Sequence, residues 1–542
     1  MPVTSNGKEG QSRWKWARRL AVAISVVVAI SAATGAIYLL AWYVPDVLAR
    51  RPGTNASVES AYISAGAALL GVIATAAVAI FAFWYSRLTI RDQGEQLDKT
   101  LASQLTRTLN ERFATAAGQL GGDKPPAVRL AGVYAMAGLA DDWEKNRQTC
   151  VDVLCGYLRL PHEPDPGNNA DPAERAAYRA SREVRQTIIR LIGAHLRPEA
   201  PTPWQGLDFD FTGVIFDGGD FTAARFSGGI VLFTDAVFSG GQVRFEGAKF
   251  SGAEVPFFGA KFSGGVVRFD RAEFSGGLVF FRAQFSGGQV SFYDAEFSGA
   301  KVNFGGARFS GAEVPFLRAK FSGASVNFGA AQFSGSKVGF HHAEFSGAEV
   351  NFGSAEFSSN EVSFYEAKFS SGQVRFEGAK FSGAEVNFIR AEISGGQLGF
   401  GGAMFSGGIV RLGAMFSGGT VDFGAVFSGG TVDFGGAKFS GTKVGFDHAR
   451  FSGGTVDFGG ANFSGGTVDF DAASFFGGTV NLGGAMFSGG EVDFSRSADW
   501  EHPPKFGRDG APSPGVKLPA QPDASLPDGP PDVADSPQPT ES

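Results

Sequence analysis

Cysteine and methionine are scarce in this chain of 542 residues, with 2 and 5 copies. Two cysteines cannot build a disulfide framework or a cysteine-rich metal domain. Cys150 and Cys155 lie five positions apart, a spacing that suits neither a redox pair nor a zinc knuckle, so we expect buried thiols. An excess of positive charge is also lacking. The net charge is −7, which argues against a nucleic-acid-binding protein.

Catalytic motifs are lacking as well. The sequence has no HExxH zinc motif, no phosphate-binding loop and no serine in a glycine-rich elbow. His341 and His342 have only Glu344 close by in sequence, which is too few ligands for a metal site. Asp433 and Asp457 are 24 residues apart and would offer one carboxylate per repeat, whereas calcium takes about six to eight converging oxygens. We therefore predict no enzyme activity, catalytic residue, metal or cofactor.

Two long uncharged stretches lie near the N-terminus. Leu20–Val44 has 25 residues without a charge, and Ala61–Ser86 has 26. A membrane-spanning helix needs about 20 apolar residues. Tryptophan and tyrosine stand at the ends of both stretches, as is typical of membrane interfaces. The sequence therefore predicts two transmembrane helices and a short connecting loop within residues 20–86.

The distribution of lysine and arginine predicts the orientation of these helices. Basic residues are dense before the first stretch, sparse between the two, and frequent again after the second: Lys8, Arg13, Lys15, Arg18, Arg19; Arg50, Arg51; Arg87, Arg91, Lys99, Arg107. Basic loops stay on the cytoplasmic side of a membrane. We predict a multi-pass cell-membrane protein with a basic cytoplasmic N-terminus (residues 1–19), an external loop and a cytoplasmic C-terminus.

Residues 87–203 have helical patterns. Leucine or phenylalanine recurs at every fourth position from Leu97 to Phe113, which predicts one helix over 87–119. This stalk either packs on neighbouring helices or joins copies of the chain into a homo-oligomer, and the lack of strict heptads favours packing. Three more patterns, over 128–139, 142–160 and 173–196, complete a predicted cytoplasmic stalk and α-helical bundle.

A twelve-residue repeat dominates residues 204–497. Phenylalanine recurs at every fifth position from Phe211 to Phe226 and then at alternating steps of seven and five to Phe487, in units that read F-S-G-G-x-V-x-F-x-x-A-x. Apolar residues two apart share one face of a strand, and the glycine density excludes helix. A short strand cannot bury its face alone, so the units must stack as a parallel β-solenoid.

The core has more room for two units per coil than for one. A one-unit ribbon would crowd two phenylalanines and a valine into each layer, whereas 24 residues give four short sides and four columns of rings. Phe226 to Phe487 is 261 residues, and restoring the residues missing from three short units gives 264, or 22 units and 11 coils. We favour two units per coil and keep the ribbon as the alternative. Asparagines at a 24-residue step, Asn303, Asn327 and Asn351, then predict a hydrogen-bonded ladder.

The five-residue steps of DFTGVIFDGGDFTAARF, residues 210–226, resemble the pentapeptide-repeat proteins. The resemblance implies a right-handed quadrilateral β-helix. The segment that begins at Glu111, ERFATAAGQLGGDKPPAVRLAGVYAMAGLADDW, is similar to the region before such repeats in membrane-anchored actinobacterial proteins. Some pentapeptide-repeat proteins mimic DNA and bind a topoisomerase. This makes an acidic DNA-mimic regulator the alternative function, although residues 205–494 carry only 28 acidic against 20 basic side chains.

Aromatic residues beside the core positions are candidates for contact with a partner. Phe258, Phe280, Tyr293 and Tyr365 follow or precede inward phenylalanines and should lie on the surface, where they could anchor a protein. We therefore predict a membrane-anchored cytoplasmic β-solenoid that acts as a protein-binding or scaffold module. Its expected partners are the lipid bilayer and an unidentified protein, not nucleic acid.

The last segment, residues 498–542, has the composition of a disordered tail. It is acidic, and 11 of its last 42 residues are proline. Such a segment cannot bury enough apolar surface to fold by itself.

Overall fold

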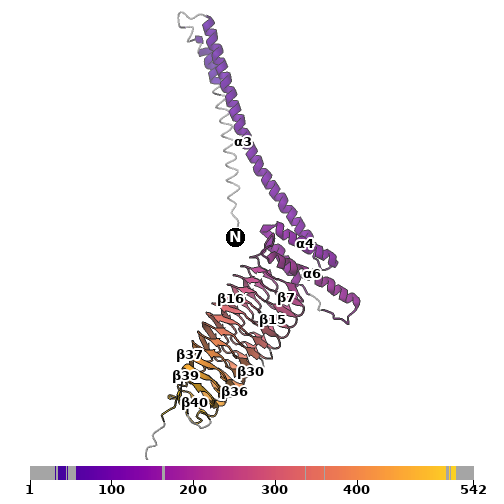
Figure 1. The fold of residues 1–542 in the computed structure, drawn as a ribbon. Helices are drawn as coiled ribbons and strands as arrows, with labels where there is room; N and C mark the ends of the chain where they lie inside the picture. The colour runs from indigo at the N-terminus through magenta and orange to yellow at the C-terminus, as the bar shows by residue number, and fades with distance from the viewer. Residues whose placement is uncertain are drawn as a thin grey trace, which may run out of the picture. The chain divides into compact units, whose positions relative to one another are not determined.

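The computed structural model of the chain describes residues 31, 34–43, 45–46, 50, 56–161, 165–335, 337–358, 361–507, 512 and 514–520. The chain forms two compact units, Met1–Asn110 and Glu111–Ser542. Figure 1 traces both units, and each is described by itself.

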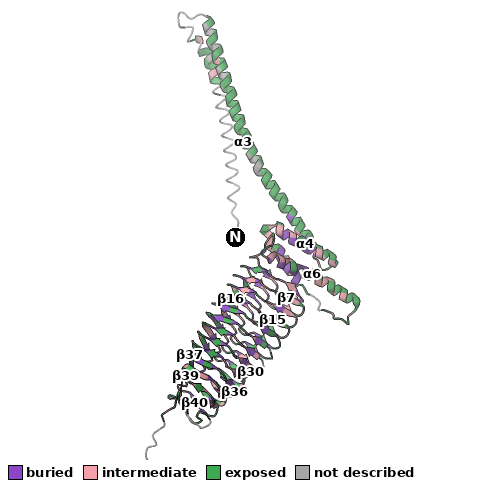
Figure 2. Cartoon of the chain, in the orientation of Figure 1, coloured by how far each residue is buried: buried purple, intermediate pink, exposed green. Residues whose placement is uncertain are grey.

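The first unit contains a π-helical turn, η1 (Leu39–Tyr43), and most of the long helix α3 (Ala56–Gln119) (Figure 1). Much of the first uncharged stretch and all of residues 1–19 lie outside the described residues. The second uncharged stretch lies in α3. Nearly all of its described apolar side chains are exposed, for example Val78 at 67% and Trp84 at 64% (Figure 2). Among the residues that the structure describes, no helix is long and apolar enough to cross a membrane.

α3 also confirms the predicted helix over 87–119. Its leucine stripe is exposed at Leu97 (58%), Leu101 (53%) and Leu105 (61%), and it is buried at Leu109 (7%). Among the described residues, nothing covers the first three leucines, and the choice between packing on neighbouring helices and joining copies of the chain stays a prediction.

Three helices of the second unit match the predicted patterns. They are α4 (Pro126–Asp142), α5 (Arg147–Arg159) and α6 (Pro172–Leu196), with a short 3₁₀ turn, η2 (Glu144–Asn146), between α4 and α5. Proline begins α4 and α6, where its missing N–H costs nothing. The three helices contact one another and share a core of fully buried side chains: Val133, Met136, Val151, Leu154, Ile188 and Ile192.

The rest of the second unit is a parallel β-solenoid, from β1 (Phe209–Asp210) to β44 (Val516–Lys517) (Figure 1). A representative pair is β6 (Val237–Phe238) and β10 (Lys261–Phe262), in which Phe238 lies opposite Phe262, 24 residues later. The step falls to 23 where a unit is one residue short, as between Lys261 and Gln284. Two units therefore make one coil, and the one-unit ribbon is excluded.

Four columns of rings fill the solenoid. Phe238 and Phe262 stack with ring centroids 4.6 Å apart and planes 2° apart, and later coils repeat this contact. The four columns begin at Phe211, Phe216, Phe221 and Phe226. The Phe226 column reaches Phe487 in 11 steps, as predicted: Phe226, Phe250, Phe274, Phe297, Phe321, Phe345, Phe369, Ile393, Phe416, Phe439, Phe463, Phe487.

Two kinds of corner close each coil. At the Ser-Gly-Gly corner, the strands on both sides join into one in several later coils. Examples are β30 (Lys380–Asn387) and β36 (Val426–Asp433), each of which includes the Ser-Gly segment. At the other corner, Phe-x-x-Ala, the alanine N–H donates to the phenylalanine carbonyl, as from Ala331 to Phe328 at 3.0 Å. The third residue of this turn has positive φ, for example Ala330 at 55°.

Strand pairing extends past residue 497, where we predicted the tail to begin. β43 (Glu491–Asp493) pairs with β44, and Trp500 packs edge-on against Phe475 and Phe494 with centroids 5.5 and 5.4 Å apart. The ring covers the last layer of the core, which would otherwise be open to water. The remaining expected tail, residues 521–542, lies outside the described residues.

Candidate functional site

The four predicted contact residues fall on two different corners of the coil. Phe258 follows Phe257, and Phe280 precedes Phe281 in the next coil, so the two side chains meet with ring centroids 5.1 Å apart. Phe258 is 40% exposed and Phe280 is half-buried. Tyr293 and Tyr365 belong to the corner half a coil away, and both are half-buried.

Tyr293 and Tyr365 are three coils apart in one column of corner residues. The column has one residue per coil and consists of half-buried rings and apolar side chains: Tyr293, Leu317, His341, Tyr365 and Ile389. We call it the corner column. The contact residues predicted from the sequence did not include Leu317, His341 and Ile389, which the 24-residue coil length places in the same column.

Charged side chains flank the corner column. Arg318 lies 4.5 Å from the centre of the Tyr293 ring and donates two hydrogen bonds to Asp294, at 2.8 and 2.7 Å. Arg390 donates to the Tyr365 hydroxyl at 2.7 Å and to Glu366 at 3.1 Å. Hydrogen bonds from Arg390 and then Tyr365 lower the pKa of Glu366. The column therefore presents aromatic faces whose flanking charges are already paired.

The two adjacent histidines lie beside this column. Burial lowers the pKa of His341, and the His342 ring nitrogen is 3.2 Å from Glu366. Over the described ranges, no group of three or more histidine, cysteine, aspartate or glutamate side chains is placed to hold a metal ion.

The predicted asparagine ladder is confirmed. The Asn327 amide donates to Asn303 at 3.2 Å, and the Asn351 amide donates to Asn327 at 3.2 Å. Each of these oxygens also accepts a backbone N–H two residues later, as from Gly329 to Asn327 at 2.8 Å. The ladder ties three coils together, and its polar atoms are engaged with one another.

Aspartates gather in the last coils. Arg496 is 3.6 Å from Asp469 and 3.3 Å from Asp471. Burial and the nearby Asp469 raise the pKa of Asp447, and one of its carboxylate oxygens is buried without a hydrogen-bond partner in the structure. Lys438, Lys443 and Arg450 are interspersed in the same coils. The acidic character is therefore local and interrupted.

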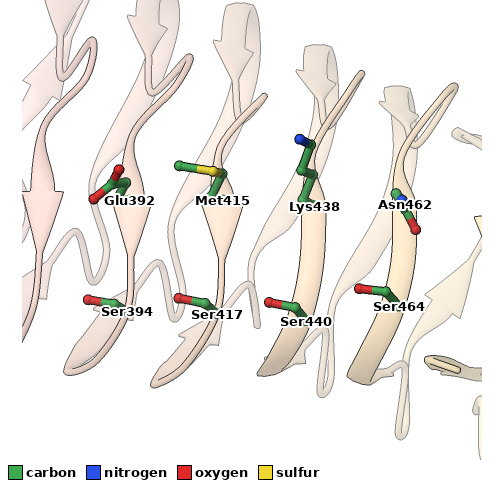
Figure 3. A pocket seen from close by; sticks show the side chains of 8 residues that line it. All are labelled: Glu392, Ser394, Met415, Ser417, Lys438, Ser440, Asn462 and Ser464. Carbon is green, nitrogen blue, oxygen red and sulfur yellow. The ribbon is translucent and has the colours of Figure 1, made fainter.

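Figure 3 shows a shallow groove along one face of the solenoid. It is about 230 Å³ in volume and runs between two rows of side chains: Glu392, Met415, Lys438, Asn462 and Ser394, Ser417, Ser440, Ser464. The serine hydroxyls are near carbonyls of the preceding coil, for example Ser464 to Phe439 at 3.2 Å. One row mixes four different kinds of side chain, whereas the other consists of four serines, so the groove has a line of hydroxyl groups along one of its sides.

A larger hollow, about 540 Å³, lies where α6 meets the first coils. Asp217 is one of its lining residues, and its carboxylate accepts hydrogen bonds from Tyr178 (3.0 Å), Arg182 (2.6 Å) and Gln186 (2.8 Å). Burial and the negative charge of Asp217 raise the pKa of Tyr178 to about 12. These contacts join the bundle to the solenoid.

A third hollow was not predicted, although the signal for it was the short unit Phe281–Phe285. Its volume is about 410 Å³, and it is lined by Phe258, Gly259, Arg282, Ala283, Gln284, Gly306 and Arg308. It contains Phe258, one of the predicted contact residues, and two arginines that were not among the predicted contact residues.

Both cysteines are buried free thiols, as predicted. Burial raises the pKa of Cys150 to about 11 and that of Cys155 to about 12. Thiols with such values are poor nucleophiles.

The regular phenylalanine spacing and the β-solenoid are consistent with pentapeptide repeats. Searches with family models, among curated proteins and among solved structures found no match to this chain.

Proposed function

We propose that this protein is a membrane-anchored, cytoplasmic β-solenoid of the pentapeptide-repeat type that acts as a protein-binding or scaffold module and has no enzyme activity. The main support is a contrast between the inside and the outside of the coil. The rings inside repeat from coil to coil, whereas the side chains at the corners differ from one coil to the next. Such a core holds the outward side chains of successive coils, about 24 residues apart in sequence, in fixed positions, so the surface that faces a partner is rigid.

The corner column supports a role in protein binding. Tyrosine is common among the residues that dominate interface energies, and a ring half-buried in its own protein loses little side-chain entropy on binding. Tyr365 is held by Arg390, so its orientation is set before a partner arrives.

The anchoring part of the proposal rests on the sequence. Leu20–Val44 and Ala61–Ser86 contain no charge, and the basic residues around them favour cytoplasmic termini. Exposed apolar side chains along α3 are what a lipid-covered or partner-covered helix presents. Leu97, Leu101 and Leu105 further support association of copies through α3.

Site-specific photo-crosslinking in cells tests protein binding. A photoreactive phenylalanine analogue at Tyr293, Tyr365 or Phe258 should form a discrete adduct with a partner, whereas the same analogue at Ser310, the exposed serine of a Ser-Gly corner, should not. Adducts from all four positions alike, or from none, would contradict the proposal.

Two further measurements test the other parts. Membrane fractions should contain the full chain, and a protease should cut its C-terminus in inverted vesicles but not in intact cells. A DNA gyrase supercoiling assay examines the DNA-mimic alternative: potent inhibition by the purified chain would replace the scaffold function with that one.

A further inference from the structure

One corner of the solenoid is a residue shorter than its neighbours. Phe257 and Ala260 are separated by two residues, and so are Phe304 and Ala307, but only Arg282 lies between Phe281 and Ala283. The turn closes through a hydrogen bond from the Ala283 N–H to the Phe281 carbonyl at 2.7 Å. The corner is therefore recessed between two full corners, and this recess is the hollow of about 410 Å³.

The missing residue also leaves a hydrogen-bonding group unused. In full corners the N–H of the third turn residue donates to the next coil, as from Gly259 to the Arg282 carbonyl (3.0 Å) and from Gly306 to the Gly329 carbonyl (2.9 Å). The residue that would donate to the Gly305 carbonyl does not exist. Among the described residues, no backbone N–H donates to this carbonyl.

The walls of the hollow combine aromatic and cationic groups. Phe258 packs on Phe280 on one side and is 40% exposed. Arg282 lies over Gly306, with its Nε 3.5 Å from where a Cβ would be. The second guanidinium belongs to Arg308, and the lining contains no carboxylate.

These two arginines differ from four other arginines of the solenoid. Arg318, Arg375, Arg390 and Arg411 each pair with a carboxylate about one coil away. Within the described part of the chain, Arg282 and Arg308 form no ion pair, so both guanidiniums remain available for an anionic ligand.

We propose that the hollow binds a short peptide segment of a partner in which a carboxylate is adjacent to an aromatic side chain. The proposal rests on the protein-binding role given above and names a place and a chemistry for it. Guanidinium groups recognise a carboxylate through paired hydrogen bonds. A further ring packs on Phe258 as aromatic pairs do, and the Gly305 carbonyl accepts a peptide N–H.

The solenoid has two other short corners, which show whether a short corner without an arginine is enough to bind the peptide. Gly413 and Gly424 are the single corner residues between Leu412 and Ala414 and between Phe423 and Ala425. A Cβ would come within 3.0 Å of the Gly435 carbonyl at the first and 2.8 Å of the Asp447 carbonyl at the second. These corners are equally short but have glycine where the proposed site has arginine, so they should not bind the peptide.

Saturation-transfer NMR with the full chain tests the proposal. The probe is acetyl-Asp-Phe-amide, compared with acetyl-Asn-Phe-amide and acetyl-Asp-Ala-amide. We expect the first to bind at least tenfold more tightly than the other two. The double variant Arg282→Gln/Arg308→Gln should weaken it at least tenfold. Arg271→Gln, at an exposed arginine on the other corner, should leave it unchanged.

A glycine inserted between Arg282 and Ala283 provides the decisive variant. It restores the two-residue corner and fills the hollow while keeping both arginines, so binding should be lost while circular dichroism and the melting temperature stay unchanged. Equal binding by the insertion variant, or an equal loss in Arg271→Gln, would overturn the proposal. If either result were found while the photoreactive analogue at Tyr365 still formed an adduct with a partner, the proposed scaffold function would hold and only peptide binding in the hollow would be rejected.

Discussion

The solenoid and the helical bundle that precedes it are held together by different kinds of contact. In the solenoid, one ring contact recurs at every coil, so each layer repeats the energetics of the last. In the bundle and at its junction with the first coils, single polar groups make contacts that occur once, such as Asp217 with three donors. A fold built by repetition can be read from spacing, whereas a junction depends on individual residues.

Removing one ring from the core should have the largest effect. Phe340 is fully buried and stacks on Phe316 and Phe364, each at 4.8 Å. Phe340→Ala should lower the free energy of unfolding by about 3–5 kcal/mol, because it removes apolar contacts and leaves a cavity. Urea unfolding followed by circular dichroism measures this loss. Phe258→Ala, at a partly exposed ring, should cost far less, and equal losses would show that the columns are not the main support.

The junction should be the next most sensitive region. Arg185 in α6 is 4% exposed and donates to the carbonyls of Leu158 (2.7 Å) and Ile215 (3.1 Å). Burial lowers its pKa. Arg185→Met keeps the volume but leaves both carbonyls without this donor, which should cost about 2 kcal/mol.

Arg190→Met is the matched control for this variant. Arg190 lies on the same helix, but its side chain is 55% exposed, so its replacement should change stability by less than about 0.5 kcal/mol. Similar unfolding midpoints for the two variants would contradict a specific role of Arg185 at the junction.

The solenoid could largely be predicted from the sequence, whereas the junction between the bundle and the solenoid could not. The recurrence of phenylalanine and valine predicted the parallel strands and favoured a coil with four columns, whereas the strand register was needed to exclude the one-unit ribbon. Arg185 and Asp217 occur once, and no spacing marked them as partners. The short unit Phe281–Phe285 was visible, but only the coil register shows that its corner is recessed between Phe258 and Arg308.

Replacing an asparagine of the ladder should cause a loss of stability smaller than that at the junction. Asn327 makes two side-chain hydrogen bonds to neighbouring coils, whereas Asp433, on the opposite face, accepts one from Gly435 within its own turn at 2.7 Å. Asn327→Ala should cost about 1 kcal/mol, and Asp433→Ala should cost less because no bond between coils is lost. Thermal unfolding of the two variants side by side measures the difference, and an equal loss would mean that the ladder adds nothing beyond the turn.

The smallest expected effect has the opposite sign. Ala330 has a φ of 55°, a left-handed conformation that is unfavourable for alanine, while Gly306 in the preceding coil has a φ of 70° at the same place. Ala330→Gly should therefore stabilise the chain, by about 0.5 kcal/mol after the greater entropy of glycine in the unfolded state is subtracted. Combining it with Ala223→Gly and Ala472→Gly, at distant corners with φ of 57° and 52°, should add the three gains in stability.

The control is Ala331→Gly, which removes a buried methyl group next to the same turn and should instead destabilise the chain by about 1 kcal/mol. A higher melting temperature for the triple variant and a lower one for Ala331→Gly would show that the corners, unlike the columns, still carry strain.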